Sequence, residues 1–206
     1  TLSNTHAGAT TVNAGSGEYL RHAPMPVAVA AEAIEALAEE GYSPNVYVND
    51  EMYVAEHSAE SDRYGGFQQI GVRAVGDLVS WLSEPPTKLV AVGDPDHLEA
   101  VKRRMRDRFE GRLFVSKSLS YFLEFARHGV TKGSGLDFVA DYLGFPTERA
   151  VAFGDGENDL ELLEHAGYGV AVGDANPELV AVSDCSIPGP EAEGVAQVIE
   201  LILARS

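Results

Sequence analysis

The spacing of hydrophobic and polar residues predicts a succession of helices and strands along the chain. Over 26–41, apolar residues recur every three or four positions, which indicates a helix that ends at a glycine. Apolar and polar residues alternate at 45–48 and 52–55, on either side of Asn49-Asp50, which predicts a β-hairpin. The same two patterns predict the other elements of the first 126 residues, which are helices at 72–82 and 96–109 and strands at 10–12, 19–20, 89–92, 113–115 and 121–125.

Beyond residue 127 the pattern becomes a regular alternation of short helices and strands. Strands that alternate with helices at short spacing are typical of parallel βαβ units. The chain is therefore predicted to be an α/β protein, with an α+β sandwich over about 21–126 and a parallel portion after it. The predicted elements of the second part are helix 133–143, strand 150–153, helix 158–165, strand 169–172, helix 177–182, strand 185–187 and helix 192–204.

The charge of the chain limits its partners. It carries 15 Lys and Arg against 32 Asp and Glu, a formal net charge of −17 at pH 7. Proteins that neutralise nucleic-acid phosphates or bind anionic lipid need a basic surface, so we expect neither nucleic acid nor membrane as a partner. Small ligands and metal cations fit this composition better, and the oligomeric state is left open.

Hydropathy and cysteine content favour a cytoplasmic protein. No apolar run approaches the roughly 18 residues of a membrane span, and the printed sequence does not open with a signal-peptide pattern. The single cysteine, Cys185, agrees with a reducing compartment. We interpret it as a small core or strand residue because no basic residue lies near it in the sequence. The six histidines lack zinc-site spacing.

Acidic residues are concentrated in one motif that directly follows a predicted strand, Gly-Asp-Gly-Glu-Asn-Asp at 154–159. Open α/β sheets bind ligands at the carboxyl ends of their strands. Carboxylates are the ligands that Mg²⁺ prefers, and Asp155 and Asp159 are spaced so that both can approach one cation. The alternative is that Asn158 and Glu161 form a capping box for the next helix. That alternative leaves Asp155, set between two glycines, unexplained.

A second candidate is Lys132, which opens a predicted helix within the glycine-rich stretch 129–135. A cation at a helix N-terminus opposes the helix dipole at a cost of a few tenths of a kcal/mol, so we expect an anion to offset it. A phosphate group would do so, since the ammonium and the helix N-terminus attract it together. The alternative is a solvated surface lysine.

Together these two stretches resemble the haloacid dehalogenase superfamily, and within it the Cof-type phosphatases with a large cap domain. In that family a Lys-Gly pair opens a helix that is followed by a strand and Gly-Asp-Gly-x-Asn-Asp. Here Lys132-Gly133 precedes the motif at 154–159 in the same order. Residues 162–175 are similar to the family's next helix and strand, and 176–179 to the start of the helix after them.

The resemblance implies a Rossmann-like core formed by residues 1–20 and 127–206, and an α+β cap formed by 21–126. It implies a Mg²⁺-dependent phosphatase that acts on a small phosphorylated metabolite, such as a phosphosugar or phosphoglycolate, through an aspartyl-phosphate. Phosphoryl transfer depends mainly on charge neutralisation and positioning, which a cation, a lysine and a carboxylate can supply.

The resemblance also implies residue roles. Lys132 would hold the phosphoryl group and Asp155 would ligate Mg²⁺. Asp159 would support the metal through water, and Asn158 would bind phosphate or position the loop. Asn49 and Asp50 at the hairpin tip would contact the substrate, the alternative being that they form only a turn.

The sequence departs from the family at the nucleophile. The family's nucleophilic aspartate lies in an Asp-x-Asp-Gly-Thr motif, which these 206 residues lack. We therefore expect a core that is incomplete at its N-terminus; because the sequence opens with Thr1, we expect the motif in residues beyond those printed. Asp94 and Asp96 share the Asp-x-Asp spacing, but Asp96 with Glu99 is better interpreted as a capping box. The alternative function is a non-catalytic remnant that acts as a binding module.

Overall fold

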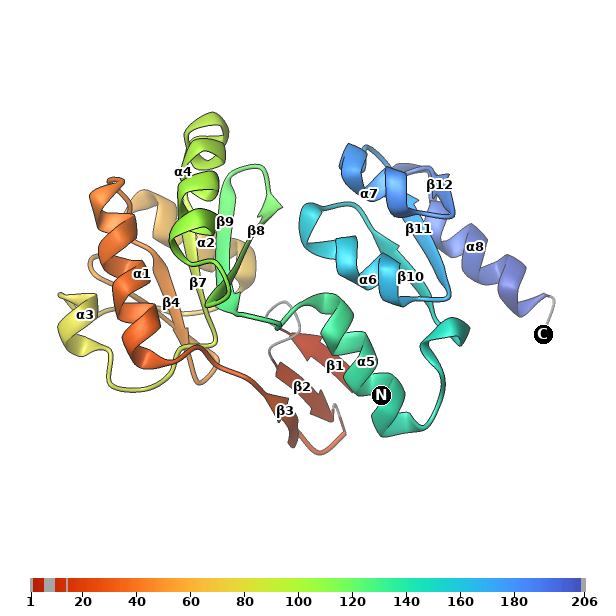
Figure 1. The fold of residues 1–206 in the computed structure, drawn as a ribbon, viewed down its shortest axis with the longest axis horizontal. Coiled ribbons are helices and arrows are strands. Elements are labelled where there is room, and N and C mark those ends of the chain that lie inside the picture. The colour runs from red at the N-terminus through yellow and green to blue at the C-terminus, as the bar shows by residue number, and fades with distance from the viewer. Residues whose placement is uncertain (1, 6–9, 14, 205–206) are drawn as a thin grey trace. The chain divides into compact units, whose positions relative to one another are not determined.

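A computed structural model describes residues 2–5, 10–13 and 15–204 of the chain. Contacts within it divide the chain into two compact units, Thr1–Val130 and Thr131–Ser206, here called the first and second unit (Figure 1). The small antiparallel sheet β1-β2-β3 groups with the first unit by its contacts. The assignment of 1–20 to a core with 127–206 and of 21–126 to a cap remains a proposal. The bounds of the small sheet are β1 Leu2–Thr5, β2 Thr10–Asn13 and β3 Tyr19–His22.

A six-stranded mixed sheet forms the centre of the first unit, in the order β6-β5-β4-β7-β9-β8. All neighbouring pairs are antiparallel except β5 and β6, which are parallel. The β4–β5 hairpin, the β7 strand and the final strand pair confirm the predicted pattern. The bounds are β4 Asn45–Val48, β5 Glu51–Val54, β6 Val72–Ala74, β7 Lys88–Val92, β8 Leu113–Leu119 and β9 Phe122–Arg127.

Helices cover both faces of this sheet because its central strands are apolar on both sides. Val46 and Leu89 point toward a large core shared with α1, α3 and α4. Their neighbours Tyr47 and Val90 point to the opposite face, where they pack with Tyr64 of α2. This alternation follows from the two-residue period of a strand. The helices are α1 Val27–Glu39, α2 Ala59–Gln68, α3 Leu78–Trp81 and α4 Pro95–Arg108.

Two predictions for the first unit are wrong. The predicted helix 72–82 is divided into β6 and the short helix α3, because Gly76 has a φ of 77° and Asp77 caps α3 through the backbone amides of Val79 and Ser80. The second concerns the cap of α4, which is the Asp94 side chain and not the predicted pair Asp96 and Glu99. The helix α2 was absent from the predicted elements, since it carries little hydrophobic periodicity.

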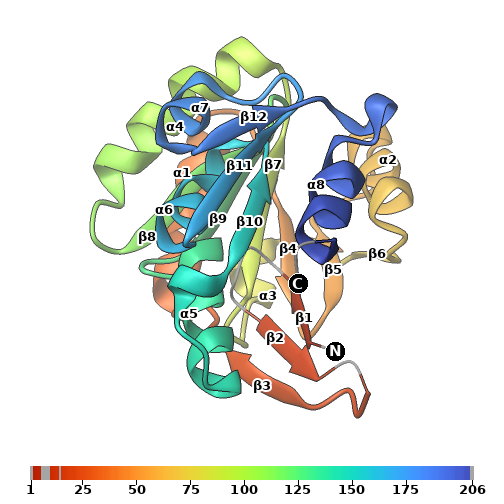
Figure 2. The same ribbon diagram turned by 90° about the vertical axis from the view of Figure 1, so that its right-hand side faces the viewer.

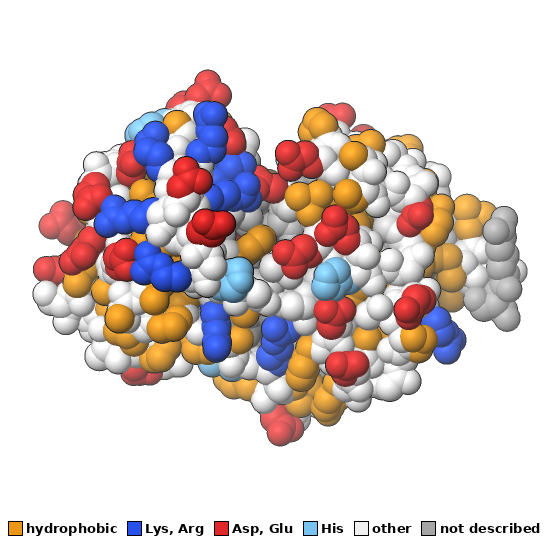
Figure 3. All heavy atoms as spheres, viewed as in Figure 1, with side chains coloured by type: hydrophobic (Ala, Val, Ile, Leu, Met, Phe, Trp, Pro, Cys, Tyr) orange, Lys and Arg blue, Asp and Glu red, His pale blue; other side chains and the backbone are white. Residues whose placement is uncertain are grey.

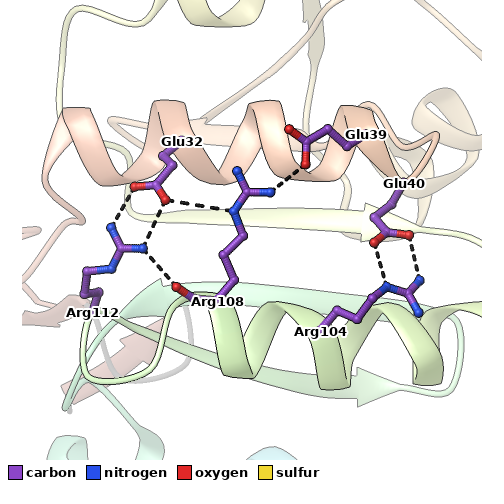
Figure 4. A network of polar contacts seen from close by, with 6 residues as sticks. All are labelled: Glu32, Glu39, Glu40, Arg104, Arg108 and Arg112. Carbon is purple, nitrogen blue, oxygen red and sulfur yellow. Dashed lines mark hydrogen bonds and ion pairs between the residues drawn. The ribbon is translucent and has the colours of Figure 1, made fainter.

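Ion pairs join the exposed faces of α1 and α4. Glu32, Glu39 and Glu40 project from α1 or its end toward Arg104, Arg108 and Arg112 from α4 and the turn after it (Figure 4). The shortest of these contacts are 2.6 Å long and join Glu39 to Arg108 and Glu40 to Arg104. The second of these pairs is bidentate, with two hydrogen bonds between the guanidinium and the carboxylate. Figure 3 shows basic side chains gathered among acidic ones over this face.

The second unit is built on the parallel sheet β10-β11-β12, whose strands lie side by side in Figure 2. Its small core is formed by Ala152, Leu163 and Leu179, with four partly buried apolar neighbours. The structure confirms the alternation of helices and strands predicted for this part. The bounds are α5 Lys132–Leu143, β10 Val151–Gly154, α6 Leu160–His165, β11 Tyr168–Val172, α7 Pro177–Val182, β12 Cys185–Ile187 and α8 Gly194–Leu203.

Among the residues described, no helix combines the length and the apolar character that a transmembrane segment requires.

Candidate functional site

The acidic motif lies where the buried strand β10 ends. The chain leaves Gly154 and passes through a single 3₁₀ turn, Glu157–Asp159, before α6 begins. Asp155 is exposed at the carboxyl end of the strand, whereas Asn158 and Asp159 are buried. This is the edge of an open α/β sheet at which ligands usually bind.

Asp159 folds back over the end of β10 and holds the loop. Its Oδ2 atom accepts hydrogen bonds from the backbone amides of Asp155, at 3.2 Å, and Gly156, at 3.1 Å. Gly154 makes this close approach possible, because a Cβ atom at residue 154 would lie 2.5 Å from the Cβ of Asp159. A glycine is therefore required at the strand end for the aspartate to occupy its position.

The second carboxylate oxygen of Asp159 accepts a hydrogen bond from Nζ of Lys132, the first residue of α5. The Asp159 side chain is 5% exposed and that of Lys132 is 32% exposed. The expectation of an anion beside Lys132 is met by a carboxylate of the chain itself. The alternative of a solvated surface lysine is wrong, because the ammonium is ion-paired and partly buried.

The start of α5 is fixed by a reciprocal capping box between Thr131 and Ser134. The Thr131 hydroxyl accepts from the Ser134 amide at 3.1 Å, and the Ser134 hydroxyl accepts from the Thr131 amide at 3.0 Å. The Thr131 hydroxyl also donates to the Glu161 carboxylate on α6. Gly133 allows α5 and α6 to approach, since a Cβ there would lie 2.6 Å from the Glu161 carbonyl oxygen.

These contacts correct the capping alternative for the motif. Glu161 binds Thr131, and neither the 3₁₀ turn nor α6 has a side-chain cap hydrogen bond. Asn158 is 8% exposed, and among the described residues no hydrogen-bond partner is found for its side-chain amide. Asn158 is therefore not a helix cap in this structure.

Asp155 faces a hollow of about 260 Å³ at the carboxyl ends of the three parallel strands. Asp174 and Glu191, which follow β11 and β12, line the same hollow. Within the part of the chain that the structure describes, no three His, Cys, Asp or Glu side chains converge as a complete metal site. Mg²⁺ is usually bound by one or two carboxylates and keeps several waters. The oxygen donors present therefore fit a hydrated Mg²⁺ held by Asp155, and do not form a closed cage.

Asn49 and Asp50 lie in the first unit, at the tip of the β4–β5 hairpin. Both have positive φ values, 51° and 62°, which is the backbone of a type I′ turn. The Asn49 amide donates to Glu84 at 2.8 Å, and Asp50 accepts from the Tyr19 hydroxyl. That hydrogen bond, together with burial and the charge of Asp50, raises the pKa of Tyr19. Asn49 and Asp50 therefore form a hairpin turn, which was the alternative to their contacting the substrate.

The residues that position the site were not among those predicted. Thr131 and Ser134 have capping-box spacing, so their local contact has a sequence signal. The contact between Thr131 and Glu161 spans thirty residues and has no such signal.

Comparison with known proteins now identifies the family. The family model for haloacid dehalogenase-like hydrolases matches residues 4–199. The chain therefore belongs to the haloacid dehalogenase-like hydrolase family. A solved haloacid dehalogenase-like hydrolase from Bacteroides thetaiotaomicron has a TM-score of 0.82 and 26% identity, and the match covers 98% of this chain and 76% of that one.

Curated relatives match over varying lengths. The 5-amino-6-(5-phospho-D-ribitylamino)uracil phosphatase YitU of Bacillus subtilis is 28% identical over 191 residues, 89% of this chain and 68% of that protein. A phosphoglycolate phosphatase of Archaeoglobus fulgidus is 37% identical over 73 residues, 35% of this chain and 33% of that protein. A Haemophilus influenzae relative is 33% identical over 115 residues, so the matched part spans only 44% of that protein.

Proposed function

We propose that this protein hydrolyses phosphomonoesters of small metabolites in a Mg²⁺-dependent reaction, with Lys132 and the 154–159 motif as its phosphate and metal site. The observation that carries the proposal is the convergence of Lys132 and Asp159 at the end of β10, beside the exposed Asp155. Family membership and the phosphatase names of the relatives support it.

Each residue has a proposed task. The Lys132 ammonium attracts the phosphate dianion and orients it by a charge-assisted hydrogen bond. Asp155 holds Mg²⁺, which when bound neutralises charge on the phosphate oxygens. Asp159 holds both Lys132 and the loop in position. Because both of its carboxylate oxygens already accept hydrogen bonds, Asp159 supports the metal through a water molecule. Asn158 offers its buried amide to the phosphate.

The proposal includes a substrate class and a location. Phosphosugars and phosphoglycolate are the predicted substrates, and the Archaeoglobus relative named for phosphoglycolate supports the second of these. Asn49 and Asp50 stay as proposed substrate contacts of the first unit, although their hydrogen bonds to Glu84 and Tyr19 serve the hairpin. The proposed cytoplasmic location is supported by the single cysteine, which agrees with a reducing compartment.

The test is hydrolysis of p-nitrophenyl phosphate by the full-length protein, with Mg²⁺ or with EDTA. We expect activity only with Mg²⁺, and a loss of about 100-fold or more in kcat for Asp155→Asn and Lys132→Ala, since one lost charge contact at a reacting group has effects of that order. The matched control is Asp141→Asn, which removes an exposed carboxylate of α5 outside the site. Activity that resists EDTA, or an Asp155→Asn variant equal to the control, would contradict the proposal.

The alternative function is a phosphate-binding module without turnover. It is favoured by the lack of an Asp-x-Asp-Gly-Thr motif in the 206 residues. Titration with inorganic phosphate and Mg²⁺ distinguishes the two cases. Binding that is lost in Lys132→Ala, without turnover by the wild-type protein, would establish the binding module.

A further inference from the structure

The first unit contains a hollow of about 540 Å³ where the strands β5, β6 and β7 end. These three strands run in the same direction, because β5 and β6 are parallel and both β5 and β7 pair antiparallel with β4. The helix α2 connects β5 to β6, so these elements form a βαβ unit. Ligands of open α/β sheets bind outside the carboxyl ends of the strands, which is where this hollow lies in the first unit.

Carboxylates without cationic partners line this hollow. Glu56, Glu60 and Asp77 contribute three of them. Among the described residues, no lysine or arginine contacts Glu56 or Glu60. Other glutamates of the same unit, such as Glu51 and Glu99, form ion pairs. The hollow therefore carries negative charge that the neighbouring side chains do not neutralise.

The positive groups near the hollow are already balanced. Among the described residues that line it, only His57 is basic, and its Nδ1 atom lies 2.8 Å from Oδ1 of Asp62. The N-terminus of α2 has acidic residues in its first turn, Glu60 and Asp62, which balance the positive end of the helix dipole. An anion would therefore be repelled by the remaining carboxylates, and a cation would be attracted.

A buried amide points to a ligand independently of these charges. Asn45, the first residue of β4, lines the hollow and is only 3% exposed. It shares a strand face with Tyr47, which packs against α2. Among the described residues, no hydrogen-bond partner is found for the Asn45 side-chain amide. Buried polar side chains are nearly always hydrogen-bonded, so a donor from a ligand in the hollow would complete this position.

The lining residues favour an elongated cation over a metal ion. Within the part of the chain that the structure describes, no three His, Cys, Asp or Glu side chains converge on one point. A compact metal ion needs converging oxygen ligands. The hollow also has apolar surface, which comes from Val54, Ala55 and Val92. Separate carboxylates together with apolar surface match a ligand whose positive charges are joined by methylene groups.

We propose that this hollow binds an aliphatic diamine, with its ammonium groups paired with Glu56 and Glu60 and its methylene groups against Val54 and Val92. A primary ammonium has three hydrogen-bond donors, so one group can bind a carboxylate and the amide oxygen of Asn45 at the same time. The diamine is a separate molecule and not part of the phosphorylated substrate. The inference does not depend on the proposed phosphatase activity.

The experiment measures binding of putrescine to the full-length protein by calorimetry, without Mg²⁺ and without a phosphate ester. Butylamine, which has one ammonium group, and butanediol, which has none, are the comparison ligands. We expect putrescine to bind about 2- to 5-fold more tightly than butylamine, the effect of a second exposed ion pair, and butanediol not to bind. Hydrogen exchange in α2 and β4 should become slower with putrescine, whereas exchange in α5 should not change.

Substitutions at the hollow locate the ligand. Glu56→Gln and Glu60→Gln should each weaken putrescine binding about 2- to 5-fold, the range for one exposed ion pair. Asn45→Ala should weaken it about 10-fold, because it removes a hydrogen bond to a charged donor. The urea transition followed by Trp81 fluorescence shows whether each variant is folded. The matched control is Glu110→Gln, which removes an exposed carboxylate that follows α4 and, among the described residues, also lacks a basic partner.

The control separates a site from general attraction, since a net charge of −17 attracts any polycation. The inference is overturned if putrescine does not bind, if butylamine binds as tightly, or if Glu110→Gln weakens binding as much as Glu56→Gln does. Slower exchange in α5 without a change in α2 would place the diamine in the second unit and would also overturn it. Because Mg²⁺ and phosphate esters are absent, failure of the phosphatase test leaves these outcomes unaffected.

Discussion

The two units of the chain differ in their balance of acidic and basic residues and in how much apolar surface they bury. Residues 1–130 contain 18 acidic and 12 basic residues, and six of these form ion pairs between α1 and the segment from α4 to the turn after it (Figure 4). Residues 131–206 contain 14 acidic residues and only three basic ones, of which Lys132 is paired with Asp159. The second unit therefore carries the larger excess of acidic residues, and three of these, Asp155, Asp174 and Glu191, line the hollow at the carboxyl ends of its strands, which favours a cation as ligand.

The first unit also buries more hydrophobic residues than the second. The main core of the first unit contains twenty buried residues, whereas that of the second contains three. Among the described residues, ten exposed large hydrophobic side chains belong to the second unit and four to the first. Since buried apolar area is the main source of stability, we expect the first unit to be the more stable one. The candidate site therefore lies on the unit that is expected to be less stable.

The largest effect is expected from Phe125→Ala, which empties a fully buried position in the first unit. The free energy of unfolding of that unit should fall by about 3–5 kcal/mol. Fluorescence of Trp81, the only tryptophan and a member of the same unit, reports its urea transition. Hydrogen exchange in β11 reports the second unit and should not change. A parallel shift of both signals would show that the units unfold together, which removes the basis of the comparison.

Mg²⁺ should act on the second unit alone. At a concentration 100 times its Kd, a ligand that binds only the folded state stabilises it by about 2.7 kcal/mol. We expect slower hydrogen exchange in β10 and β11 with Mg²⁺, and no shift of the Trp81 transition. Asp155→Asn should abolish the effect, whereas Asp141→Asn should retain it. Equal stabilisation of both units would indicate general charge screening and not a specific site.

Two glycine substitutions compare the packing of helices in the two units. Gly133→Ala forces a Cβ against the backbone of α6, so we expect a loss of about 1–3 kcal/mol in the second unit. Gly66→Ala meets open space within α2 and should stabilise the first unit by about 0.5–1 kcal/mol. Both changes gain helix propensity, so their difference isolates the backbone contact. Similar effects of the two substitutions on unfolding would disprove that close approach.

The smallest effect concerns the ion pairs of α1 and α4. Hydrogen bonds from Arg112 and Arg104 lower the pKa values of Glu32 and Glu40 below 4.5. A carboxylate with a lowered pKa contributes stability at pH values above 4.5, and this contribution is lost as the pH falls through its folded-state pKa. The exposed pairs are also screened by salt. We expect Glu40→Gln to reduce the acid and salt sensitivity of the Trp81 transition slightly, with Glu35→Gln as the control on the same helix.

The regular βα alternation of the second unit was predictable from the sequence because each strand there pairs with strands close to it in the chain. The first unit was harder. Val72–Ala74 becomes a strand only because it pairs with β5, and its apolar spacing is equally compatible with a helix. The helix α2 contains two glycines and few apolar residues, so periodicity does not reveal it.

The candidate site, too, could be predicted from the sequence only in part. Lys132, Asp155 and Asp159 were identified from their types and spacing, and the structure brings Lys132 and Asp159 into contact. The alternative in which Asn158 and Glu161 form a capping box is wrong, because the actual partner of Glu161 is Thr131, which lies thirty residues away. Local motifs can be inferred from one sequence, but competition between local and distant partners is decided by packing.

The pairing of Lys132 with Asp159 has a consequence for the end of a catalytic cycle. A lysine without a counter-ion would hold an inorganic phosphate tightly, and its release would then limit turnover. Here Asp159 already neutralises much of the charge of the Lys132 ammonium, so a bound phosphate gains less from the lysine than it would from an unpaired cation. If phosphate binds as proposed, this pairing favours rapid product release and weak product inhibition.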